Sequence, residues 1–180
     1  MTTPVNNSGT TALSEVLAQI DLGPTDSIQF AFAKLQLAQA QICKNSARDY
    51  MEQIENIQKE QSEVAKMISD ARKLQNDCKT KQGNCSWDKE ASIMPKEMAD
   101  WMDKRGLAYD KTGNDLVNNY DEWTFNIESL TNYQESISNQ TQTLMVYLQD
   151  FISQYNSYLQ GANSAISNAS QVLTAVATGR

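Results

Sequence analysis

Histidine is absent from this 180-residue chain, and glycine and proline are scarce. Without histidine there is no His-based catalytic triad, no His-ligated zinc site and no side chain that ordinarily titrates near neutral pH. Seven Gly and three Pro are about half the usual share, which argues against a turn-rich β-sandwich. The chain also has no base paired with a nucleophile and no Gly-rich phosphate loop, so we expect no enzymatic activity, no cofactor and no metal.

Cysteine is scarce as well, with only Cys43, Cys78 and Cys85. Three residues at uneven spacing do not make a disulfide framework, and a Cys-only metal site would need a fourth ligand. Cys78 and Cys85 lie seven residues apart and could close a small loop through a disulfide. We favour the interpretation that Cys43 packs within a helix and that the other two are free thiols.

One acidic segment has some features of a calcium loop, because Asp110 begins it and Asp121 follows eleven residues later. Its Gly113 is fourth in the loop, where an EF-hand needs glycine sixth, and Thr112 occupies the position of the usual second carboxylate. We therefore interpret residues 110–115 as a surface turn that links two helices.

Positive charge is in the minority, with 15 Lys and Arg against 22 Asp and Glu and a net charge of −7. This balance disfavours nucleic acid and anionic membranes as partners. No run of 18 apolar residues occurs, so we expect no direct membrane span. Because the first basic residue is Lys34, residues 1–27 lack the pattern of a Sec signal. We expect a polar, flexible leader that could carry another export signal, with a short helix near Val16.

Two long proline-free segments carry apolar residues at alternating spacings of three and four, the pattern of coiled-coil helices. We expect an all-α fold in which residues 28–82 and 123–180 form a coiled-coil hairpin, with a small inserted region at 83–122. The expected coiled-coil face consists of Ile54, Ile57, Val64 and Ile68 in the first helix, and of Leu144, Leu148, Phe151, Ile152, Tyr155, Tyr158, Leu159, Ala162, Ile166, Ala169, Leu173 and Val176 in the second.

Two features of the second helix point to self-assembly. Its apolar face is wider than a two-stranded coiled coil needs, because Phe151 and Tyr158 flank the main seam. Residues 151–179 contain no charged side chain, and an uncharged polar face suits burial against other copies, where charges would be costly to desolvate. The alternative is a low-charge hairpin in a monomer.

The inserted region has a different composition, with short elements and clustered aromatic residues. We expect Pro95 to begin a short helix and Gly106 to end it. Trp87, Trp101 and Trp123 form either a small core against the long helices or an exposed contact surface.

Four stretches of the sequence resemble the EspA/SseB-type extracellular filament proteins of bacterial type III secretion systems. The first long helix of that family is similar to residues 28–41 (IQFAFAKLQLAQAQ) and 58–67 (QKEQSEVAKM). Its proline-led short helix and glycine turn look like residues 94–110 (MPKEMADWMDKRGLAYD). Its Gln-rich C-terminal coil resembles residues 138–156 (SNQTQTLMVYLQDFISQYN).

The resemblance implies a secreted structural subunit, exported without a Sec signal, that polymerises into a hollow helical filament on the type III secretion needle at the bacterial surface. Such a filament is a virulence structure that conducts effectors and translocators toward the host cell. The implied partners are further copies of the chain, a dedicated cytoplasmic export chaperone, the needle and the hydrophobic translocator proteins. Two alternatives stay open: a needle-tip protein that closes into a small ring, and a monomeric helical ligand-binding domain or enzyme that uses the aromatic insert.

Overall fold

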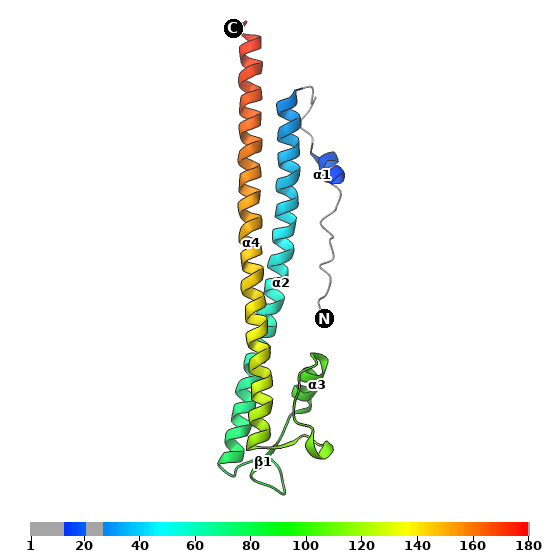
Figure 1. Cartoon of the computed structure of the whole chain (residues 1–180), viewed down its shortest axis with the longest axis vertical. Helices are drawn as coiled ribbons and strands as arrows, with labels where there is room; N and C mark the ends of the chain where they lie inside the picture. Colours follow the sequence, from blue (N-terminus) through cyan, green and yellow to red (C-terminus); the bar gives the residue numbers. More distant parts are fainter. Residues whose placement is uncertain (1–12, 21–26, 180) are drawn as a thin grey trace. The chain divides into compact units, whose positions relative to one another are not determined.

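The protein is described by a computed structural model over residues 13–20 and 27–179. Two long helices, α2 (Ile28–Lys79) and α4 (Tyr120–Ala177), pack against each other, which confirms the predicted helical hairpin (Figure 1). The shorter elements are α1 (Leu13–Gln19), β1 (Ala91–Ile93), α3 (Lys96–Lys104), the 3-10 turn η1 (Thr112–Asn114) and β2 (Val117–Asn119).

Contacts divide the chain into two compact units. Unit 1 comprises Met1–Gln53 and Leu144–Arg180, so its described part contains α1, the first half of α2 and the second half of α4. Unit 2 comprises Ile54–Thr143, which contains the remainder of both long helices and the inserted region.

Small side chains occupy the buried positions of α2 and α4 in unit 1. The buried positions on these helices are Ala33, Ala38, Ala40 and Cys43 on α2, and Ala162, Ala165 and Ala169 on α4. Aromatic stacking adds to this contact, because the Tyr50 ring lies 5.5 Å from the Phe151 ring and 5.8 Å from the Tyr147 ring, centre to centre. Each such pair contributes about 1 kcal/mol beyond its buried area.

Unit 2 has a larger hydrophobic core that attaches the inserted region to the long helices. Its members are Val64, Ile68, Ala71 and Cys78 of α2, Trp123, Leu130 and Ile137 of α4, and Met94, Met98, Ala99 and Met102 of the inserted region. Met98 and Met102 lie on the buried face of α3. Since fully burying one large apolar side chain contributes about 1.5–3 kcal/mol, these methionines fix α3 against the core.

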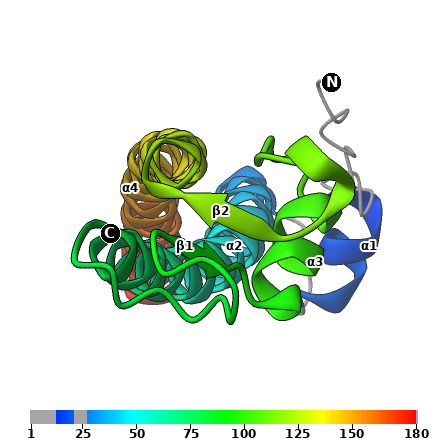
Figure 2. The same ribbon diagram turned by 90° about the horizontal axis from the view of Figure 1, so that it is seen from below.

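A two-stranded antiparallel ribbon joins the two ends of the inserted region in unit 2 (Figure 2). β1 and β2 pair with Ala91 opposite Asn119 and Ile93 opposite Val117. The sequence does not predict this ribbon, because three-residue strands are too short to show an alternating pattern. Buried polar side chains of the ribbon have hydrogen-bond partners within the protein: Ser92 Oγ of β1 donates to the Leu74 carbonyl (3.2 Å), and Asn118 Oδ1 of β2 accepts from Asn126 Nδ2 of α4 (2.9 Å).

The long helices begin at side-chain caps. Ser27 directly precedes α2, and its hydroxyl oxygen accepts a hydrogen bond from the Phe30 backbone N–H at 3.4 Å. α4 begins at Tyr120, three residues before the predicted start, because Asn119 and Glu122 form a capping box. Asn119 Oδ1 accepts from the Glu122 N–H (3.0 Å), and the Glu122 carboxylate accepts from the Asn119 N–H (2.7 Å).

The other helix ends follow from backbone conformation. α2 ends at Lys79, three residues before the predicted end, because Lys81 adopts a left-handed φ of 59° and turns the chain. α3 lies between Pro95 and Gly106, whose φ is +66°, and both predicted boundaries are confirmed. At Gly83 the backbone passes so close to the ribbon that a Cβ would lie 2.0 Å from the Ala91 carbonyl oxygen.

Candidate self-association surface

The predicted coiled-coil face is divided by the structure into a packed part and an exposed part. The packed residues are buried or half-buried between the long helices: Ile54, Ile57, Val64 and Ile68 in unit 2, and Leu144, Leu148, Phe151, Tyr155, Tyr158, Leu159, Ala162, Ile166 and Ala169 in unit 1. Ile152, Leu173 and Val176 are exposed. Most of the predicted face therefore packs within the chain, and these three residues remain accessible to another molecule.

The end of α4 is the most exposed part of this face. Residues 170–179 are all exposed, and the exposed fractions of Leu173 and Val176 are 58% and 73%. Figure 1 shows the last turns of α4 extending beyond the first residue of α2, its packing partner in unit 1. An apolar helix face that carries no charge and has no cover within the described residues is typical of an interaction site.

A second exposed apolar patch lies farther back on α4, at Met145, Val146 and Tyr147. Leu144 and Leu148 on either side are half-buried, so α4 is apolar around its whole circumference here. The prediction of a single face misses this patch. Five consecutive apolar residues, LMVYL, are the signal that could have revealed it, since a helix that is apolar all round needs burial on more than one side.

An open groove of about 600 Å³ runs between α2 and α4 of unit 1. Its apolar lining includes Ala47, Met51, Ile152 and Tyr155, and Lys44 is among its polar lining residues. Met51 and Ile152 are also exposed. The remaining lining residues are Arg48, Gln41, Asn45 and Asn156, so the groove mixes apolar side chains with amides and two cationic side chains.

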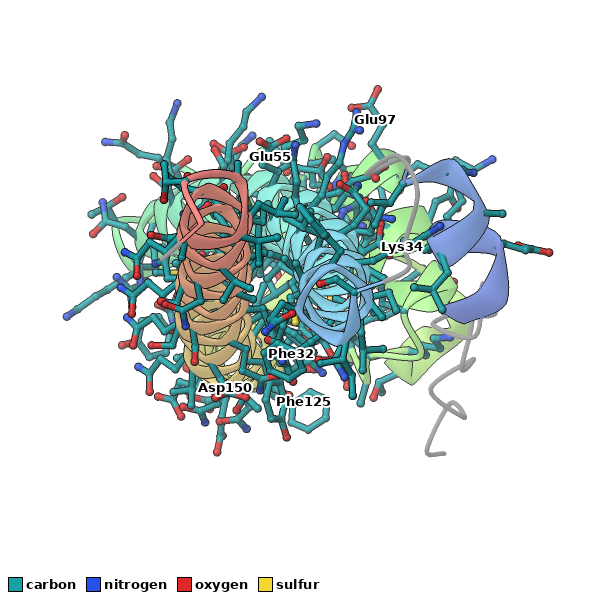
Figure 3. All side chains as sticks on the ribbon, turned by 90° about the horizontal axis from the view of Figure 1, so that it is seen from above. Phe32, Lys34, Glu55, Glu97, Phe125 and Asp150 are labelled. Atoms are coloured by element: carbon teal, nitrogen blue, oxygen red, sulfur yellow. The ribbon has the colours of Figure 1, made fainter. Side chains whose placement is uncertain are left out.

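The three tryptophans lie in three different environments in unit 2. Trp123 is fully buried in the core, Trp101 is half-buried, and Trp87 is 75% exposed in the segment between α2 and β1. Phe125, two residues beyond Trp123, instead projects outward from α4 (Figure 3). Trp123 therefore belongs to the core, whereas Trp87 and Phe125 are exposed. The three tryptophans do not form one cluster.

Trp101 belongs to a polar cluster that joins the end of α3 to both long helices in unit 2. Its indole N–H donates to Glu63 Oε2 (3.0 Å), and the Arg105 guanidinium stacks on its ring and pairs with Glu60. The Tyr133 hydroxyl of α4 donates to Glu60 Oε1 (2.7 Å). Burial raises the pKa of Glu60, but the hydrogen bonds from Tyr133 and Arg105 and the Arg105 charge outweigh it and lower the pKa below its usual value.

All three cysteines are buried free thiols, so the disulfide considered for Cys78 and Cys85 is not formed. The Cys78 thiol is instead directed to Ser92 Oγ (3.2 Å) and to the Asn118 carbonyl (3.6 Å). Burial raises the pKa of this thiol and nearby Asp77 adds to the shift, while the Ser92 contact opposes it. The favoured interpretation, a packed Cys43 and free thiols at Cys78 and Cys85, agrees with this arrangement.

The acidic segment after α3 is a turn, as interpreted from the sequence. Asp110 accepts hydrogen bonds from the Thr112 backbone N–H (3.0 Å) and hydroxyl (2.9 Å), and Gly113 turns the chain with φ +78°. The turn links α3 to β2 rather than to a second helix. The Asp110 side chain is therefore used in local hydrogen bonds.

Comparisons with known proteins add no relative from which a function could be carried over. The chain has no significant match among protein-family models, curated protein sequences or solved structures. In the described part of the chain, no helix is both long and apolar enough to cross a membrane.

Proposed function

We propose that this chain is a secreted structural subunit that assembles with further copies into a hollow helical filament extending a type III secretion needle. The observation that carries the proposal is the exposed, uncharged end of α4, with Leu173 and Val176 accessible. A second copy would remove this apolar surface from water without the cost of desolvating charges.

Exposed apolar residues on several parts of unit 1 support a polymer over a closed pair. Besides Leu173 and Val176, they include Val146 on α4 and Phe32 and Met51 on α2. Contacts between two different surfaces on identical subunits are heterologous, and they generate open helical chains or rings. A dimer that covered one of these surfaces would leave the others exposed.

The resemblance to EspA/SseB-type proteins supplies the destination and the partners of the proposed subunit. It would be exported without a Sec signal and would conduct effectors and translocators at the bacterial surface. A dedicated chaperone would cover the apolar helix surfaces in the cytoplasm, because exposed apolar patches of this kind promote aggregation. Contacts with the needle and with hydrophobic translocators would follow at the two ends of the filament.

The test compares two aspartate substitutions at the end of α4. Leu173→Asp places a charge at an exposed apolar position, and Gln171→Asp places the same charge at an exposed polar position two residues away. We expect Leu173→Asp to abolish fibres in electron micrographs and Gln171→Asp to retain them. Leu159→Asp or Ile166→Asp should also abolish polymer, but both residues are half-buried between the helices, so these variants also perturb packing.

The outcomes separate the alternatives. Normal fibres from Leu173→Asp would refute the role of this surface. Small closed rings from the wild-type chain would favour a needle-tip protein. A monodisperse monomer that binds a small ligand would favour the ligand-binding alternative, although Trp101 and Trp123 are already occupied by internal packing.

A further inference from the structure

The two long helices begin with opposite charge, and these beginnings belong to different units. In unit 1, residues 28–48 of α2 contain Lys34, Lys44 and Arg48 and no carboxylate. α4 contains five carboxylates and no Lys or Arg over its whole length. Four of the five lie in unit 2: Asp121, Glu122, Glu128 and Glu135. The acidic part of α4 in one copy therefore complements the basic part of α2 in another.

The basic part of α2 borders the open groove of unit 1. Lys44 and Arg48 both line this groove, are exposed and lie one helical turn apart, a spacing at which like charges repel. The ion pairs of the described residues include neither of them. Met51 and Ile152, which are exposed apolar residues, line the same groove. The groove therefore suits a partner surface that combines carboxylates with an apolar side chain.

A face of α4 in unit 2 has this combination. Phe125 is 47% exposed and projects outward from α4 (Figure 3). Asp121 lies four residues before Phe125 and Glu128 lies three residues after it, so the three share one side of the helix. Both carboxylates are exposed, and neither forms an ion pair within the described residues. These three residues make an acidic–aromatic face.

We propose that the acidic–aromatic face of unit 2 in one copy docks into the groove of unit 1 in a second copy. This inference rests on the proposed function and names one contact of its polymer. The ring of Phe125 covers Met51 and Ile152, while the carboxylates beside it pair with Lys44 and Arg48. Because the two surfaces are different, the contact is heterologous and repeats from copy to copy as an open chain.

The test exchanges the charges of the two surfaces in the full-length chain. A groove variant carries Lys44→Glu with Arg48→Glu, and a face variant carries Asp121→Lys with Glu128→Lys. Each variant alone sets like charges against each other, so we expect its critical concentration for fibre formation, measured by sedimentation and electron microscopy, to rise at least about tenfold. An equimolar mixture should form fibres again, because each groove then meets a face of opposite charge on the other variant.

Matched controls reverse two exposed charges outside both surfaces. Lys59→Glu with Lys66→Glu makes the same charge change as the groove variant, and Glu97→Lys with Asp100→Lys makes the same change as the face variant. All four residues are exposed and lie outside the groove and the acidic–aromatic face. Both controls should therefore form fibres at the wild-type critical concentration.

The outcomes separate this contact from the proposed function. An unchanged critical concentration for either the groove variant or the face variant would overturn the contact while leaving filament formation intact. Folded variants that fail both alone and as a mixture would also overturn it. If circular dichroism shows that a charge-reversed variant is unfolded, Lys44→Gln with Arg48→Gln decides, and an unchanged critical concentration overturns the contact. A wild-type chain that stays monomeric would refute the proposed function and this contact with it.

Discussion

The Arg105 guanidinium lies 3.8 Å from the centre of the Trp101 ring, and both side chains contact carboxylates of α2. Trp101 donates to Glu63, while Arg105 pairs with Glu60 and reaches Glu63 at 3.5 Å. A flat, permanently charged guanidinium can stack and form ion pairs at once. The end of α3 is therefore fixed to α2 in unit 2 by a stacked pair together with the methionine core.

Replacing Arg105 should destabilise this attachment. We expect Arg105→Ala to lower the free energy of unfolding by about 1–3 kcal/mol, because the cation–π contact is lost and the partly buried Glu60 carboxylate loses its partner. Arg105→Lys retains the charge but loses the planar stacking, so its loss should be smaller. Urea denaturation of the three proteins measures both differences, and an Arg105→Ala variant as stable as the wild type would contradict this role.

Glu60 should make the stability depend on pH in the acid range. Burial raises its pKa, yet the hydrogen bonds from Tyr133 and Arg105 outweigh burial, so the folded-state pKa is below the usual 4.5. The stabilisation is fully present above about pH 4.5 and is lost as the pH falls through the folded pKa. Between pH 6 and roughly pH 3, the free energy of unfolding should change less with pH in Glu60→Gln than in the wild type.

Glu55→Gln provides the matched control for this titration. Glu55 is an exposed carboxylate on the same helix of unit 2. This variant should keep the wild-type pH dependence. If the free energy of unfolding of Glu60→Gln and of Glu55→Gln changed equally with pH, the pH dependence would not arise from Glu60 and its partners Arg105 and Tyr133.

The cysteines should be unreactive in the native protein. Cys43, Cys78 and Cys85 are buried and free, and burial raises the pKa of Cys43 and Cys78, which disfavours the reactive thiolate. We expect Ellman's reagent to label all three only after denaturation. Mass spectrometry without reductant should find three free thiols, and a loss of two hydrogens confined to Cys78 and Cys85 would contradict the structure.

Gly83 should tolerate substitution less well than Gly106. A Cβ at Gly83 meets the Ala91 carbonyl oxygen at 2.0 Å, which requires the ribbon backbone to move, whereas Gly106 has open space around it and a φ of +66°. Gly106→Ala should cost about 1 kcal/mol from the left-handed backbone alone, and Gly83→Ala should cost more, about 2–4 kcal/mol. Thermal unfolding of the two variants gives the order, and the reverse order would contradict the close approach.

The long helices could be predicted because their signal extends over many residues. The alternating spacing that contains Leu159, Ala162 and Ile166 is repeated through several heptads, and Pro95 and Gly106 delimit α3 directly. The start of α4 was also readable in principle, because Asn119 and Glu122 have the spacing of a capping box.

Other features depend on contacts that spacing does not encode. The β1–β2 ribbon is fixed by partners far apart in the sequence, such as Ala91 and Asn119. The heptad pattern likewise treats Leu159 and Leu173 alike, although Leu159 packs within unit 1 and Leu173 is exposed. Which part of an apolar face remains accessible depends on where its partner helix ends.

Electron microscopy of the purified wild-type chain at neutral pH, after removal of any chaperone, tests the central claim most directly. The exposed, uncharged end of α4 leads us to expect long, uniform, hollow fibres. A preparation that stayed monodisperse as single chains at high concentration would contradict self-assembly through this surface.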